Sequence, residues 1–312
     1  MTIFSSAKSF KLSALLFLLV FHLSCSGQDV TSSIKIDGTR TSIPFILHDN
    51  RIFLKTVIGK KSFHFILDTG GGIVVDTDAA DSLQLPKIRQ GDIAGTGENP
   101  VPLYRTFVDT ISIGGLQIIN KEAMVISLKE IKNALQLDFL DGIVGYEVFQ
   151  RFITEINFAD SIVTFIEKET FHIPDSYYAI PFRLLNNRIP VIKVNIDGTD
   201  ADFIVDTGGR SNLTLFSKFS DENNFRNRYI LSDTVMTGYG LGGPINGQQL
   251  KIRNVKLNES LTVNDVTARI PTTRSGAFNR TDSIKGSAGN GLLKNFNRII
   301  FDYFNKKLYI ER

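Results

Sequence analysis

Two matching motifs hold the residues of this sequence whose chemistry is most distinctive. Asp68-Thr69-Gly70 and Asp206-Thr207-Gly208 each follow three apolar residues, as expected for a buried strand that ends in a turn. Two carboxyl groups held side by side cannot both ionise cheaply, so such a pair keeps one shared proton over a wide pH range. One group could then take a proton from water while the other protonates a carbonyl oxygen or a leaving amine.

A plainer alternative is that both motifs are simple turns, because Asp and Gly are common turn residues. A turn aspartate normally faces water, whereas Asp68 and Asp206 follow runs that are apolar enough to be buried. The two motifs also lie at equivalent positions of an internal repeat, which chance does not readily produce. We therefore favour a carboxylate pair over two unrelated turns.

The internal repeat extends to both sides of the motifs. Residues 43–52 return as residues 180–189 with seven of ten positions identical, and Gly142-Ile143-Val144-Gly145 returns as Gly286-Ser287-Ala288-Gly289. Two copies of roughly 130 residues predict one fold that is duplicated, because solenoid repeats are only about 20–50 residues long. A pseudo-twofold axis between the copies would bring the two aspartates together at its centre.

Each copy has the sequence pattern of β structure. Short runs of Ile, Val, Phe and Thr alternate with turn residues, and Gly59-Lys60 and Asp197-Gly198 read as hairpin turns. Helical periodicity is confined to three short stretches, around residues 77–83, 128–137 and 146–152. We expect a mostly β chain of two related lobes with short helices.

The N-terminal segment has the features of an export signal. Lys8 and Lys11 precede an apolar run over residues 12–23, which is too short to span a bilayer and fits a secretory signal. The run ends at Cys25, as in bacterial lipoproteins, so we expect lipidation there and a place in the cell envelope, periplasmic or associated with the outer membrane. Cleavage after Ser26-Gly27, which would give a secreted protein, is the alternative.

These observations divide the chain into five segments. We expect a lipoprotein-type signal peptide, a tether, an N-terminal lobe, a linker and a C-terminal lobe, at residues 1–24, 25–42, 43–170, 171–179 and 180–312 respectively. A proline and an acidic turn mark the linker.

Composition excludes several classes of function. The net charge is +3, and +1 from Cys25 onward, so there is no electrostatic footprint for nucleic acid or an anionic membrane. The single cysteine, Cys25, excludes an intrachain disulfide and a Cys-rich zinc site. His48, His64 and His172 are scattered, and we expect no metal and no cofactor. Residues 238–243 fit the G-x-G-x-x-G pattern, but turn residues follow instead of a helix, so we expect a flap rather than a nucleotide site.

The paired motifs resemble those of pepsin-like aspartic proteases, and more closely those of the retropepsin-like aspartyl proteases of exported bacterial proteins. The resemblance covers most of residues 43–312. It implies a bilobed fold of two duplicated β-barrel-like lobes and an endopeptidase that acts on a peptide or protein. Asp68 and Asp206 would be the catalytic pair, Thr69 and Thr207 would hydrogen-bond across the lobes, and Gly70 and Gly208 would be turn glycines. Because one chain holds both halves, we expect a monomer.

The resemblance also implies a flap over the substrate. We place it at Gly95-Thr96-Gly97, with a counterpart near Tyr239; Tyr104 is a second candidate for a flap tyrosine. Gly71 and Gly209 stand where serine or alanine is usual, and Ser287-Ala288-Gly289 is smaller and more polar than its first-half equivalent. These departures leave open an alternative function, a catalytically silent envelope protein that binds peptides in the retained cleft.

Arg210 follows the second motif closely. We expect its side chain to reach solvent, the alternative being that it binds a substrate carboxylate.

Overall fold

A computed structural model describes residues 31–97, 99–173, 175–272 and 282–311. Residues 32–312 form one compact unit, and the fold below concerns that unit alone. The expected signal peptide and Cys25 lie outside the described residues. Within them, no helix combines the length and the apolar character needed to cross a bilayer.

The first half of the chain forms strands where apolar runs alternate with turn residues, as the sequence predicts. Its strands are β1 (Ser33–Ile36), β2 (Arg40–His48), β3 (Arg51–Ile58), β4 (Lys61–Leu67), β5 (Val74–Asp76), β6 (Ile88–Ala94), β7 (Pro100–Ile113), β8 (Leu116–Ile126), β9 (Gly142–Val144), β10 (Ile153–Asn157) and β11 (Ile162–Ile166).

The second half repeats this succession and confirms the prediction of a mostly β, duplicated and bilobed fold. Its strands are β12 (Tyr177–Leu185), β13 (Ile189–Ile196), β14 (Thr199–Asp206), β15 (Leu213–Leu215), β16 (Val235–Gly240), β17 (Gly243–Lys256), β18 (Thr262–Pro271), β19 (Gly286–Gly289), β20 (Arg298–Asp302) and β21 (Lys307–Glu311). Both predicted hairpin turns are confirmed, because β3 pairs with β4 and β13 with β14 around them.

Helices in the described residues are short. They are α1 (Thr77–Ser82), α2 (Lys129–Leu135), α3 (Tyr146–Arg151), the 3-10 turn η1 (Lys168–Thr170), α4 (Ser217–Glu222), α5 (Phe225–Arg228) and α6 (Asn290–Leu293). The first three coincide with the stretches of helical periodicity in the sequence.

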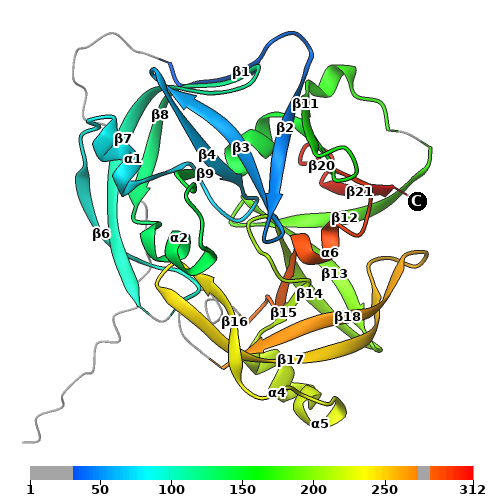
Figure 1. The fold of residues 1–312 in the computed structure, drawn as a ribbon. Coiled ribbons are helices and arrows are strands. Elements are labelled where there is room, and N and C mark those ends of the chain that lie inside the picture. The colour runs from blue at the N-terminus through cyan, green and yellow to red at the C-terminus, as the bar shows by residue number, and fades with distance from the viewer. Residues whose placement is uncertain (1–30, 98, 174, 273–281, 312) are drawn as a thin grey trace, which may run out of the picture. The chain divides into compact units, whose positions relative to one another are not determined.

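A six-stranded antiparallel sheet joins the two halves. Its order is β2–β11–β10–β20–β21–β12, so each half supplies three strands, and β10 pairs with β20 where the halves meet. β2 and β12 each continue beyond this sheet and pair with β3 and β13 of their own lobe. Figure 1 shows β3, β4, β7 and β8 gathered on one side and β13 to β18 on the other.

The core runs continuously through both halves. Its largest buried side chains include Phe149 in α3 and Phe301 in β20, whose rings meet edge to face with centroids 5.2 Å apart. Phe152 and Phe165 are also buried, and Phe158 packs against the core from its edge.

The structure corrects the predicted tether and linker. β1 and the start of β2 lie within residues 25–42, so a tether is wrong for residues 33–36 and 40–42. β1 pairs with the edge of β8, burying Ile36, and four residues are too few to stand out as a strand in the sequence. β12 likewise begins at Tyr177, inside the predicted linker over residues 171–179.

Candidate active site

Two equivalent strand ends position Asp68 and Asp206. β4 ends just before Asp68 and runs parallel to β9, and the Asp68 N–H donates to the carbonyl oxygen of Val144 at 3.0 Å. β14 ends at Asp206 and runs parallel to β19 in the same way. Ile143-Val144-Gly145 of the first half and its smaller counterpart in the second half, Ser287-Ala288-Gly289, therefore support the two aspartate loops from equivalent positions.

Thr69 and Thr207 lock the two loops to each other. Each backbone N–H donates to the other threonine's hydroxyl, at 2.9 Å from Thr69 and 3.1 Å from Thr207. Each hydroxyl in turn donates to a carbonyl of the opposite half, Thr69 to Val205 at 2.7 Å and Thr207 to Leu67 at 2.9 Å. Both side chains are fully buried, so water cannot replace these four hydrogen bonds.

This lock brings the carboxyl groups of Asp68 and Asp206 into hydrogen-bonding contact. The Gly70 N–H donates to Oδ1 of Asp68 at 2.7 Å, and the N–H groups of Gly208 and Gly209 donate to Asp206. A Cβ on residue 208 would lie only 2.5 Å from the carboxyl carbon of Asp68, so glycine is required there for space. Both predicted turn glycines thus contact the pair.

The two carboxyl groups are not electrostatically equal. Burial raises the pKa of Asp68 to about 7, and the neighbouring charge of Asp206 adds to the rise. Burial also raises the pKa of Asp206, but the hydrogen bond from Asp68 and the nearby guanidinium of Arg51 oppose that rise. Arg51 therefore favours the state in which Asp206 is ionised and Asp68 carries the shared proton.

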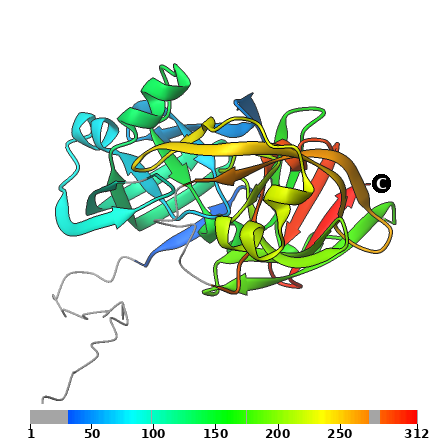
Figure 2. The same ribbon diagram turned by 90° about the horizontal axis from the view of Figure 1, so that it is seen from below.

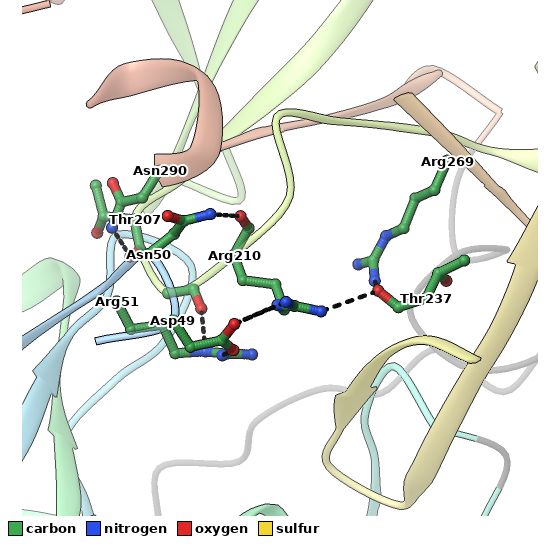
Figure 3. A network of polar contacts seen from close by, with 9 residues as sticks. Asp49, Asn50, Arg51, Thr207, Arg210, Thr237, Arg269 and Asn290 are labelled. Carbon is green, nitrogen blue, oxygen red and sulfur yellow. Dashed lines mark hydrogen bonds and ion pairs between the residues drawn. The ribbon is translucent and has the colours of Figure 1, made fainter. Parts of the chain in front are cut away.

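Arg51 approaches the pair from the first position of β3, just after the turn that Asp49 and Asn50 form. Its Nε donates to the carbonyl oxygen of Gly208 at 3.1 Å, and it is paired with Asp49. Asp49 also accepts from Nε of Arg210 at 2.7 Å, while Asn50 donates to the Arg210 carbonyl at 2.8 Å (Figure 3). The turn of one half thus holds the aspartate loop of the other.

Arg210 differs from its expected role. Its side chain keeps 39% of its surface exposed, but the guanidinium is held by Asp49 and by the Thr237 carbonyl instead of extending freely into solvent. Its neighbours Asp49, Arg51 and Arg269 were not singled out in the sequence. Arg51 could have been, because Asn50-Arg51-Ile52 returns as Asn187-Arg188-Ile189, whereas nothing in the sequence marks Arg269.

Asn290 is a further unpredicted residue beside the motifs. It is fully buried at the start of α6, and its Nδ2 donates to the Thr207 carbonyl at 2.5 Å (Figure 3). Its backbone N–H bonds the Gly209 carbonyl, as that of Tyr146 bonds the Gly71 carbonyl in the first half. The second aspartate loop is thus supported by the side chain of Asn290. At the equivalent position of the first half stands Tyr146, whose backbone N–H makes the corresponding bond.

A cavity of about 210 Å³ lies over the carboxyl pair. The first half lines it with mostly apolar side chains between Ile66 and Ile143 and with Arg51. The second half lines it with Arg210, Tyr239 and Arg269 and with the apolar Leu241 and Ile245. Thr96 of the predicted flap also lines it, whereas Tyr104 is absent from the lining and lies under Arg89. Tyr239 is therefore the flap tyrosine candidate that reaches the cavity.

Two hairpins cover this cavity and meet at their tips. β6 and β7 carry Gly95-Thr96-Gly97, and β16 and β17 carry Leu241-Gly242. The Gly97 N–H donates to the Leu241 carbonyl at 2.9 Å, and the Asn99 N–H to the Gly242 carbonyl at 3.0 Å. A Cβ on residue 97 would fall 2.2 Å from the backbone of Gly242, so only glycine allows this approach. Figure 2 shows the yellow β16–β17 hairpin reaching toward the first half.

Comparison with known proteins agrees with this geometry. Residues 54–148 match a family model described as aspartyl protease. The crystal structure of an aspartic proteinase from Irpex lacteus is similar with a TM-score of 0.55 and 11% identity, covering 87% of this chain and 97% of that one. No curated protein matches the sequence. The fold is thus that of the pepsin-like aspartic proteinases, and the family model supports a relation to aspartyl proteases.

The threonine lock predicts a specific loss of stability. Thr69→Val or Thr207→Val keeps the shape but leaves a buried N–H and a buried carbonyl without partners, so we expect each to lower the free energy of unfolding by about 2–4 kcal/mol. Thr56→Val is a matched control, because Thr56 is equally buried but bonds only Leu54 of its own strand. Urea denaturation measures the difference; equal losses in all three variants would contradict an interlobe role.

The raised pKa of Asp68 predicts a pH-dependent gain in stability from Asp68→Asn. The folded state binds this proton more tightly than the unfolded chain, whose value is 3.8, so the wild type loses stability as pH rises from about 4 to 7. The amide removes that loss, and we expect it to stabilise the protein by up to about 4 kcal/mol near pH 8 but little near pH 4. Thermal unfolding at both pH values tests this; a gain that does not change with pH would count against it.

Proposed function

We propose that this protein is an aspartic endopeptidase, in which Asp68 and Asp206 activate water to hydrolyse a peptide bond. The observation that carries the proposal is the pair of hydrogen-bonded carboxyl groups, one from each half, at the base of a cavity covered by two hairpins. The match of residues 54–148 to an aspartyl protease family model supports it.

The unequal environments assign a role to each carboxyl group. Asp206, whose ionised form Arg51 favours, takes a proton from water as the water oxygen attacks the carbonyl carbon. Asp68 gives its proton to the carbonyl oxygen, so that a tetrahedral diol forms. Collapse of the diol breaks the C–N bond, as the proton held by Asp206 passes to the leaving nitrogen. Asp68 takes a proton back from a diol hydroxyl, so that a carboxylic acid forms and the pair again holds one proton. No metal or cofactor takes part in these steps.

Substrate entry requires the hairpin tips to separate. A cavity of about 210 Å³ is too small for several residues of an extended peptide. Two backbone hydrogen bonds close the tips, and each contributes only about 1 kcal/mol, so opening is inexpensive. The peptide would then pair its backbone with a hairpin strand as an added strand.

Catalysis by the pair predicts that cleavage depends on both carboxyl groups. We expect Asp68→Asn and Asp206→Asn each to lower the rate of peptide cleavage by at least about 100-fold, because each removes one proton-transfer group. Asp109→Asn, an exposed aspartate in β7, should cleave like the wild type. Mass spectrometry of a digested peptide library measures all four proteins. Wild-type rates in the pair variants would refute the proposal, and absence of cleavage with retained peptide binding would favour the silent binding protein.

We also propose that the protein is exported and anchored through a lipid on Cys25. The basic residues Lys8 and Lys11, the short apolar run and the cysteine at its end support this. Cys25→Ser should abolish incorporation of a labelled fatty acid in cells and release the protein from the membrane fraction. Incorporation that survives the substitution would argue against the anchor.

A further inference from the structure

The two halves differ in chemistry at equivalent positions of the strands around the cavity. The strand registers define which positions are equivalent. In the first half β5 lies between β8 and β9, and in the second half β15 lies between β18 and β19 in the same way. Three apolar residues of the first half have polar or charged counterparts in the second: Val74, Met124 and Ile143 correspond to Thr214, Arg269 and Ser287. Of these six residues, Val74, Ile143 and Arg269 line the cavity, so the second half adds a cation where the first half is apolar.

Arg269 is held firmly but has no acidic partner. Its Nε donates to the hydroxyl of Thr214 at 2.9 Å. Its Nη1 donates to the carbonyl of Thr237 at 3.2 Å, and Figure 3 shows Arg269 beside Thr237. Gly238 makes room for the guanidinium, because a Cβ there would lie 2.5 Å from Nη1. No carboxylate in the described part of the chain forms an ion pair with Arg269, and its other N–H groups donate to no described residue.

The charge around this wall is unbalanced. Arg51 and Arg210 share the carboxylate of Asp49, and the catalytic pair with its shared proton holds one further negative charge. Burial and the charges of Arg210 and Arg51 lower the pKa of Arg269 to about 10, which still leaves it a cation at neutral pH. A fixed guanidinium without a counter-ion matches the planar, two-oxygen geometry of a carboxylate.

Space for such a group exists beside the pair. Arg210 and Arg269 line both the main cavity and an adjoining pocket of about 150 Å³. The rest of that pocket is neutral, with Asn212, Gln249 and Thr267 among its polar residues and no acid.

We propose that Arg269, together with Arg210, forms a subsite that binds a carboxylate of the substrate on the second-half side of the catalytic pair. The carboxylate can come from an Asp or Glu side chain or from the C-terminus of the peptide. The consequence for cleavage rests on the proposed function, whereas the binding does not.

Binding of uncleavable peptides tests this subsite independently of catalysis. Each peptide of the first set would have a central statine, an amidated C-terminus and a single Glu at one of the three positions on either side of the statine. A matched peptide would carry Gln at the same position. A second set would end at each of these positions with a free or an amidated terminus. Calorimetry would measure their affinities for the wild type, Arg269→Met, Thr214→Val and Arg183→Met. Arg183→Met is the charge-matched control, because Arg183 pairs with Asp202 outside both cavities.

At one of these positions we expect the peptide with Glu to bind about 10-fold or more tightly than the peptide with Gln, or the peptide with a free C-terminus to bind that much more tightly than its amidated form. This preference should be present in the wild type and in Arg183→Met. The ratio should fall below about 2 in Arg269→Met, which copies Met124, and to an intermediate value in Thr214→Val, which copies Val74. The set that shows the preference identifies the source of the carboxylate. If Arg269→Met does not fold, Thr214→Val decides.

No preference in the wild type, a preference that survives in both cavity variants, or no binding of any peptide would overturn the subsite. A second outcome separates the two proposals: the protein could bind the acidic peptides selectively but fail to cleave the same peptides when an ordinary peptide bond replaces the statine. That result would support the subsite and refute the endopeptidase. Cleavage at the same rate with and without an acidic residue or a free C-terminus would support the endopeptidase and refute the subsite.

Discussion

Two carboxyl groups that touch inside a protein repel each other as soon as both are charged, and much of this structure holds them together despite that cost. The reciprocal hydrogen bonds of Thr69 and Thr207 fix the two loops, and the glycine N–H groups stabilise the charge that remains. Parallel pairing of β4 with β9 and of β14 with β19 fixes the strands from which the loops leave. The six-stranded sheet joins the halves on which these strands lie.

Duplication supplies a symmetric frame, while proton transfer needs two different groups. The difference comes from charged side chains outside the motifs. Arg51 reaches across to the loop that holds Asp206, whereas Arg188, its counterpart in the repeat, stacks on the ring of Tyr146 at 5.0 Å. Arg269, which lines the cavity, likewise has the uncharged Met124 as its counterpart in the first half. The two halves thus share their backbone plan and differ in charge.

The sequence predicted the features that depend on local pattern or on repetition. Strand alternation, hairpin turns and two copies of Asp-Thr-Gly were enough for the fold, for the pairing of Asp68 with Asp206 and for the hairpins above them. The network of Asp49 and Arg269 could not be predicted, because it joins residues more than 200 positions apart that belong to no motif. β1 was missed because four residues carry too little pattern, and its stability comes from pairing with β8.

The shared proton is the claim on which the proposed chemistry depends most directly. Carbon-13 NMR of aspartate-labelled protein, from about pH 3 to pH 9, follows each carboxyl group, and the Asp68→Asn spectrum assigns the pair. We predict two well-separated titration steps for the pair, with the upper one near pH 7 and absent from the variant. Two carboxyl groups that titrate together near pH 4, like exposed aspartates, would contradict the account.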